Sequence, residues 1–292
     1  MTDTPDMPRT PPGLRLFTSN RLETLADQLA DRMRSPLASP LLPEFIVVRH
    51  RGMERWLRLE LAQRLGISAN LQFFFPEEIS HELFRTVVTD SPEQTSARRD
   101  ALLWRIVQAL PALLGRAGFE PVRHYFGGQP EPRKLVQLAS RLAQLFEQYL
   151  IYRPEMVLEW DNRRVKPEEV WQAALWREIS SGFREHHPAA LWRSFREQLA
   201  LGSAKFPGLP ERIHLFGLPA LAPFYLDVFT TVATRCEVNL FLLQPSQEYW
   251  GDITSKRDED RLLRKQSAST SDSEETPDAF ALHLETGNRL LH

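Results

Sequence analysis

Short, mainly apolar segments stand near both ends of this sequence, and a long stretch free of them separates the two groups. The segment 45–48 belongs to the first group, and 213–216 and 238–243 belong to the second. The segment 45–48 is an uninterrupted apolar run, which is typical of a parallel strand that is covered on both faces. Helical patterns connect these strands, so we expect an α/β domain with right-handed crossovers.

The first eighty residues alternate between strand and helix patterns. The segment 14–17 predicts a short strand, after which Asn20 is a suitable N-cap and Glu23 could complete a capping box. The strand 45–48 leads through a turn into a second amphipathic helix, for which Gly66 predicts the C-terminal stop.

Between residues 81 and 204 the strand patterns nearly disappear and amphipathic helices are predicted. They cover residues 101–110, 135–149, 170–183 and 190–201. Because strand patterns return near residue 205, we predict one parallel-sheet domain, formed by residues 1–80 and 205–292, that is split by an all-helical insertion of residues 81–204.

Aromatic and histidine side chains of the predicted insertion are first interpreted structurally. Trp104, Trp171, Trp176 and Trp192 stand at helical spacings and are expected to pack in the core. The pair of histidines at 186–187 precedes a proline and is expected to be an exposed helix end.

The last forty residues have a different composition. Beyond Ile253 the sequence is charged and then rich in serine, threonine and acidic residues, which predicts a disordered loop at about residues 255–280. A covered sheet of about four strands would be incomplete, so we expect the chain to be truncated at residue 292.

Composition favours a cytoplasmic protein. The N-terminus is polar and proline-rich, no apolar run is long enough for a membrane helix, and the single cysteine excludes an internal disulfide. The net charge of −2 provides no general attraction for nucleic acid. Any DNA contact must therefore come from local clusters of basic residues.

The motifs of an active nucleotide hydrolase are missing. A P-loop requires glycines, a lysine and a Ser/Thr, but no Gly-Lys pair occurs in the chain, and the segment 18–20 stands where the loop is expected. No carboxylate follows the strand 213–216, and no histidine, cysteine or acidic cluster has the spacing of a metal site. We expect no catalytic residue, no metal and no cofactor.

Several stretches resemble, in the same order along the chain, the RecC family, the gamma subunits of exodeoxyribonuclease V. They are the stretches 19–23, 47–57, 66–70, 145–154, 216–226 and 249–253. The resemblance implies an N-terminal fragment with a degenerate P-loop-NTPase domain, RecA-like and similar to superfamily 1 helicases. It also implies RecB-like and RecD-like partners and a non-enzymatic role in double-strand-break repair, guiding single-stranded DNA at a fork and scanning it for a Chi-type signal.

The resemblance also implies DNA contacts at two places, the turn after the second strand and the helix that contains Glu147 and Gln148, with Arg153 just beyond. At the turn, the family usually has Gln-Ser before x-Gly-Met, whereas this chain has Arg49-His50-Arg51 before Gly52.

Arginines make a DNA contact at this turn chemically reasonable. Arg49, Arg51 and Arg55 stand at the end of a buried strand and the start of a helix, where ligands gather in open α/β sheets. Guanidinium groups bind phosphate or a guanine edge. Phe75, the last residue of an aromatic run, could stack on a base or belong to the core.

Two alternatives remain open at this point. The turn could be a solvated basic loop, and the chain could be a protein-interaction scaffold that docks the motor subunits without touching DNA. An active ATPase is disfavoured by the missing lysine.

Overall fold

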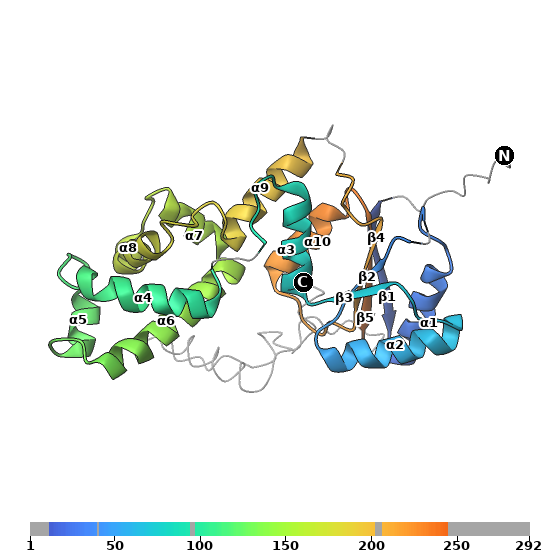
Figure 1. The fold of residues 1–292 in the computed structure, drawn as a ribbon, viewed down its shortest axis with the longest axis horizontal. Helices are drawn as coiled ribbons and strands as arrows, with labels where there is room; N and C mark the ends of the chain where they lie inside the picture. The colour runs from blue at the N-terminus through green and yellow to red at the C-terminus, as the bar shows by residue number, and fades with distance from the viewer. Residues whose placement is uncertain (1–11, 40, 94–96, 202–205, 245–292) are drawn as a thin grey trace, which may run out of the picture. The chain divides into compact units, whose positions relative to one another are not determined.

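The computed structural model describes residues 12–39, 41–93, 97–201 and 206–244 (Figure 1). The chain forms two compact units. We call them the sheet unit, which comprises Met1–Phe75, Glu211–Leu221 and Glu237–His292, and the helical unit, which comprises Pro76–Pro210 and Ala222–Cys236.

The sheet unit contains a parallel sheet of five strands within the described residues. They are β1 (Gly13–Ser19), β2 (Glu44–Val47), β3 (Leu71–Phe74), β4 (Arg212–Phe216) and β5 (Glu237–Leu243), in the spatial order β1-β5-β4-β2-β3. Every neighbouring pair is parallel. The α/β class is confirmed, but the prediction of about four strands was wrong because it missed β3.

Two helices of the sheet unit pack together against the sheet. They are α1 (Leu22–Met33) and α2 (Arg51–Leu65), whose leucines form a core with Ile46, Phe216 and Phe241. As predicted, α2 ends at Gly66, which has a left-handed φ of +80°. The predicted capping box of α1 was wrong, because the N-cap is Arg21 and its side chain makes no capping hydrogen bond.

The connections between strands create a switch point in the sheet. From β2 the chain passes through α2 to β3 on one side, whereas from the adjacent β4 it passes through α10 (Pro223–Val232) to β5 on the other side. In open α/β sheets, ligands bind outside the carboxyl ends of strands at such a point. The residues that follow β2 and β4 therefore occupy the favoured position for a binding site.

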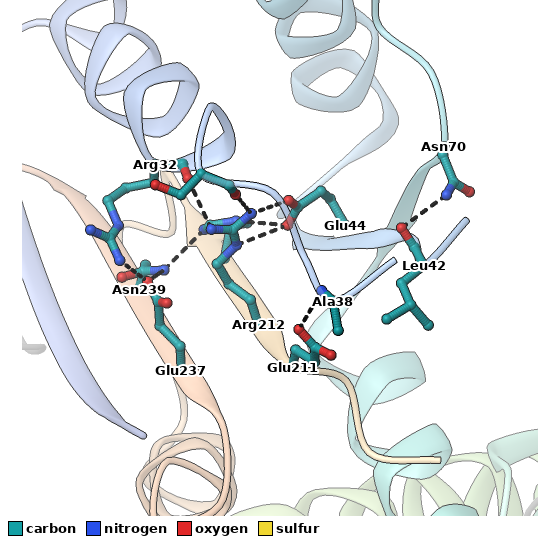
Figure 2. A network of polar contacts seen from close by, with 11 residues as sticks. Arg32, Ala38, Leu42, Glu44, Asn70, Glu211, Arg212, Glu237 and Asn239 are labelled. Atoms are coloured by element: carbon teal, nitrogen blue, oxygen red, sulfur yellow. Dashed lines mark hydrogen bonds and ion pairs between the residues drawn. The ribbon is translucent and has the colours of Figure 1, made fainter. Parts of the chain in front are cut away.

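The opposite, amino-terminal edge of the sheet contains a network of buried ion pairs (Figure 2). Arg212, only 3% exposed, donates to both carboxylate oxygens of Glu44 and to the backbone oxygens of Arg32 and Ser35. His214 Nε2 lies 3.2 Å from Glu44 Oε2. This network joins the starts of β2 and β4 to the end of α1.

A second ion pair joins β5 to the same network. Glu237 accepts from Arg32 and, at 2.8 Å, from Asn239 Nδ2, which lies 3.3 Å from His214 Nδ1 (Figure 2). Burial alone would raise the pKa of the Glu237 carboxyl, but hydrogen bonds from Arg32 and Asn239 outweigh it and keep that pKa below its ordinary value. Burial likewise opposes ionisation of Glu44, but hydrogen bonds from His214 and Arg212 outweigh it and lower the pKa of that carboxyl. Both carboxylates of the network are therefore ionised in the folded protein at neutral pH.

The helical unit has no strand within its described residues. Its first elements are α3 (Pro76–Val87), α4 (Arg99–Leu113), α5 (Glu120–Phe126) and α6 (Pro132–Tyr152). They are followed by α7 (Pro154–Asp161), the 3-10 turn η1 (Pro167–Glu169), α8 (Val170–Ile179) and α9 (Pro188–Ala200), and α10 belongs to the same unit. The four helices predicted between residues 101 and 201 are confirmed as elements.

Asp161 organises part of this helical core. Its carboxylate accepts from Trp176 Nε1 at 3.0 Å and lies 2.8 Å from His187 Nε2, while His187 Nδ1 accepts from Ala190 N and caps α9. The prediction of an exposed histidine pair was therefore wrong for His187, which is completely buried. The packing prediction was also wrong for Trp104, which is 60% exposed.

The replacement Glu44→Gln should destabilise the sheet unit strongly. It would leave the Arg212 guanidinium buried without its counter-charge, which costs about 3–5 kcal/mol in the free energy of unfolding. Urea titration of the two proteins measures this difference. The matched control Asp31→Asn, which removes the exposed partner of Arg34, should change stability by about 0–1 kcal/mol. Equal effects of both replacements would contradict a structural role for the buried pair.

His214 should make stability depend on pH. Burial lowers the pKa of its imidazole, despite the opposing attraction of Glu44. Because the unfolded chain then binds a proton more readily, stability is lost as pH falls through about 6.5, the ordinary histidine value. We expect His214→Gln to flatten the pH dependence of the unfolding free energy between about pH 6.5 and 5. Parallel urea titrations across this range would show an unchanged slope if this expectation is wrong.

Candidate nucleic-acid interface

The arginine turn, which we define as residues 49–52, lies at the carboxyl end of β2. Arg49 follows the buried Val48, His50 is the N-cap of α2, and Arg51 is the first helical residue. Arg55 stands four residues after Arg51 and therefore on the same side of the helix. The structure thus brings three of the predicted site residues together beside the switch point between β2 and β4.

His50 fixes the geometry of this turn. Its backbone is extended, and its side-chain Nδ1 accepts from Met53 N at 3.1 Å, while its carbonyl oxygen accepts from Met53 N and Glu54 N. A ring that accepts at Nδ1 carries its proton on Nε2 when neutral. The helix start therefore holds Arg49 and Arg51 on either side of an ordered cap.

A close approach of the two strand ends depends on Gly217. This residue follows β4 with a φ of +62°, and a Cβ built there would lie 3.3 Å from Met53 Cε and 3.7 Å from Leu22 Cδ2. A side chain would be strained in this conformation and crowded by both helices. Glycine therefore lets the turn after β4 pack against the starts of α1 and α2.

The electrostatic environment distinguishes the turn from the rest of α2. Arg49, Arg51 and Arg55 are exposed, and none of them forms an ion pair with any residue that the structure describes. Further along α2, in contrast, Arg58 pairs with Glu54, and Arg64 pairs with Glu60 and Asp27. Arg49, Arg51 and Arg55 are thus available to an anion.

Phe75 lies at the carboxyl edge of the same sheet, immediately after β3. It is half-buried and packs against the core that α1 and α2 share, so part of its ring serves the fold. Within the same aromatic run, Phe73 lies 4.4 Å under the Arg58 guanidinium, and Phe74 packs against Phe45 at 5.0 Å.

The other three predicted site residues lie in the helical unit, at the end of α6. Glu147 is half-buried, Gln148 is exposed, and Arg153 follows the last helical residue with its guanidinium 5.8 Å from the Tyr149 ring. The Tyr149 hydroxyl donates to Gln172 Oε1 at 3.0 Å, and burial raises its pKa. The last turn of α6 is thereby anchored against α8.

A comparison with known families identifies the family of this chain. Residues 14–292 match the family model described as RecC, N-terminal domain. The chain belongs to the RecC family. The resemblance noted in the sequence is therefore confirmed.

Individual relatives extend the comparison. The protein named RecBCD enzyme subunit RecC from Escherichia coli (strain K12) is 34% identical over 276 residues, which are 90% of this chain and 24% of that protein. Its namesake from Haemophilus influenzae is 33% identical over 273 residues, with 83% and 24% of the two chains covered. The one from Mycolicibacterium smegmatis is 29% identical over 254 residues, with 84% and 22% covered. The chain thus spans about a quarter of the length of these RecC relatives.

Three residues near Glu147 were not predicted as site residues. Burial is the largest cause that raises the pKa of the Glu77 carboxyl at the start of α3, and the negative charge of Glu147 raises it further. Burial is also the largest cause that raises the pKa of the Tyr225 hydroxyl, and the charges of Glu77, Tyr152 and Glu147 raise it further. These groups come from α3, α6 and α10, so no local sequence pattern could have indicated that they lie together in this RecC-family protein.

Other classes of site are not found in the described part of the chain. No three histidine, cysteine or acidic residues there are grouped closely enough to hold a metal ion. Among the same residues, no helix is long and apolar enough to span a membrane. The predicted disordered loop at about residues 255–280 lies outside the described residues.

The role of His50 as a helix cap can be tested by replacement. His50→Ala should lower the free energy of unfolding by about 0.5–2 kcal/mol because the Met53 amide loses its side-chain acceptor. His50→Asn should largely restore stability, since asparagine is a preferred N-cap. Urea titrations distinguish the cases. If Ala and Asn are equally destabilising, the ring acts through something other than capping.

Proposed function

We propose that this chain handles single-stranded DNA as a non-catalytic part of a RecBCD-type helicase–nuclease that acts in double-strand-break repair and recombination. The observation that carries the proposal is the group of three exposed arginines without ion-pair partners, Arg49, Arg51 and Arg55, at the switch point of the sheet. The names of the relatives support it, because each is a RecBCD enzyme subunit RecC.

The finer fold assignment is part of this proposal. We infer a degenerate RecA-like domain, formed by residues 1–80 and 205–292 and split by a helical insertion of residues 81–204. The parallel sheet and the absence of strands among the described residues between 76 and 210 support it. The missing Gly-Lys pair supports a subunit that does not hydrolyse ATP itself.

Each proposed contact has a chemical basis. Arg49, Arg51 and Arg55 would bind phosphate or a guanine edge, and the exposed part of Phe75 would stack on a base. In the helical unit, three further groups would contact the DNA: the Glu147 carboxylate, the Gln148 amide and the Arg153 guanidinium. An amide pairs with adenine and a carboxylate accepts from cytosine, so these groups fit a strand that is scanned for a Chi-type signal.

A second surface of the sheet unit has features that suit the docking of another protein. At the amino-terminal edge of the sheet, a hollow of about 280 Å³ is lined by residues that include Leu65 and Ser68, together with Leu42 and Ile67, which are 41% and 70% exposed. Exposed apolar side chains beside a hollow are typical of protein interfaces. RecB-like and RecD-like subunits are the partners that we propose, and a scaffold without DNA contact is the alternative function.

Replacing Arg49, Arg51 and Arg55 together by Ala should weaken DNA binding by the assembled complex. Each lost phosphate contact should reduce the slope of log K against log salt by roughly 0.7–0.9, and so the deficit should shrink as salt rises. If one arginine reads a guanine instead, its single replacement should cost about 1–3 kcal/mol at one base.

The matched control replaces three exposed, ion-paired arginines, Arg34, Arg85 and Arg116, by Ala. This control removes the same charge and should leave the salt slope unchanged. Binding titrations that vary salt and DNA sequence independently measure both effects. An unchanged affinity, salt slope and signal recognition in the first triple variant would favour the scaffold.

A further inference from the structure

Helix α6 exposes a row of cationic and amide side chains along its whole length. The row follows spacings of three and four residues, and all its members are exposed: Arg133, Gln137, Arg141, Gln144, Gln148 and Tyr152. Such spacings place side chains on one helix face. The opposite face is buried in the helical core through Leu142, Phe146 and Leu150. The single carboxylate within α6, Glu147, is half-buried and lies off the row.

The cations of this helix lack the partners that other helices supply. Within the described residues, Arg133, Lys134 and Arg141 form no ion pair. On α2, α3 and α5, in contrast, arginines pair with a carboxylate three or four residues before them: Arg58 with Glu54, Arg64 with Glu60, Arg85 with Glu82, and Arg123 with Glu120. The arrangement on α6 is therefore unlike the usual solvated helix face, on which opposite charges alternate.

Two of these cations also oppose the dipole of their own helix. Arg133 and Lys134 lie in the first turn of α6, which contains no acidic residue. The first turns of α8, α9 and α10 also lack an acidic residue, but none of the three contains an arginine or lysine. A cation is disfavoured near a helix N-terminus, which already carries partial positive charge. Glu131 stands at the N-cap but makes no capping hydrogen bond. Positive charge at this end therefore does not help α6 to fold, whereas it would help α6 to bind an anionic ligand.

We propose that the exposed row of α6 binds the phosphate backbone of single-stranded nucleic acid, independently of its sequence. The inference rests on the proposed DNA-handling function and extends its contact surface. Arg133 and Arg141 are eight residues apart, which corresponds to about 12 Å along the helix. Arginine and glutamine both donate to phosphate oxygens.

The far end of the row supports a single strand as the ligand. Tyr152 is 66% exposed, and an exposed aromatic ring offers a stacking surface to an unpaired base. The row also contains Gln148 and ends beside Arg153, and both residues are proposed to contact the scanned strand. The cationic half of α6 would thus hold the backbone of the strand whose bases pass the end of the helix.

The test replaces Arg133 and Arg141 by Gln in the full-length protein assembled with its partner subunits. Binding of single-stranded oligonucleotides of several unrelated sequences is titrated at increasing salt. We expect weaker binding to every sequence and a salt slope reduced by about 1.4, because each single-strand phosphate contact contributes about 0.7. The thermal unfolding temperature should be unchanged or higher, because a first-turn cation is removed.

The control replaces Arg116 and Arg196 by Gln, two exposed arginines of the same unit outside α6, and should leave the slope unchanged. If the α6 variant binds DNA normally while the triple variant of the arginine turn binds weakly, this inference is wrong and the proposed function stands. If both variants bind DNA normally, both are wrong. Loss of partner-subunit binding without any change in DNA binding would assign the row to a protein contact and would also overturn the inference.

Discussion

The buried ion pair between Arg212 and Glu44 is the interaction on which the sheet unit depends. Arg212 starts β4, Glu44 starts β2, and the residues in between span most of the helical unit, so this contact holds together strands that are far apart in the sequence. Two buried ions lose much solvation, which only a nearly complete set of partners restores. The backbone oxygens of Arg32 and Ser35 complete the set for Arg212 and add the end of α1.

Parallel strands that are fixed side by side at one edge of a sheet bring the residues that follow them together at the opposite edge. Because the network fixes β2 against β4, the residues after these strands are also neighbours, and Gly217 can lie against Met53. The arginine turn then projects from an ordered helix start and not from a free loop. The sheet unit therefore has paired charges at the amino-terminal edge, which stabilise it, and unpaired charges at the carboxyl edge, where we propose the DNA contact.

The sequence predicted those features that depend on local patterns. Short apolar segments predicted four strands, and helical periodicity predicted the helices between 101 and 201. The glycine at position 66 predicted the stop of α2. Strand β3 was missed because Phe73–Phe75 suggested stacking or core packing and shows no alternation. The burial of His187 depends on Asp161, 26 residues away, and the pairing of Arg212 with Glu44 spans 168 residues. The candidate arginines were found from the sequence, but their lack of carboxylate partners required the structure.

Arginine is placed in this chain in two distinguishable ways. Where it supports the fold, a carboxylate stands three or four residues before it on the same helix, or the guanidinium is buried against an acid from another strand, as for Arg58 and Arg212. The arginines of the arginine turn and of the exposed row on α6 have neither kind of partner among the described residues. A net charge of −2 does not reveal this division, because paired residues of opposite sign cancel in the sum. Local pairing, and not total charge, is therefore the property from which DNA contact is inferred in this protein.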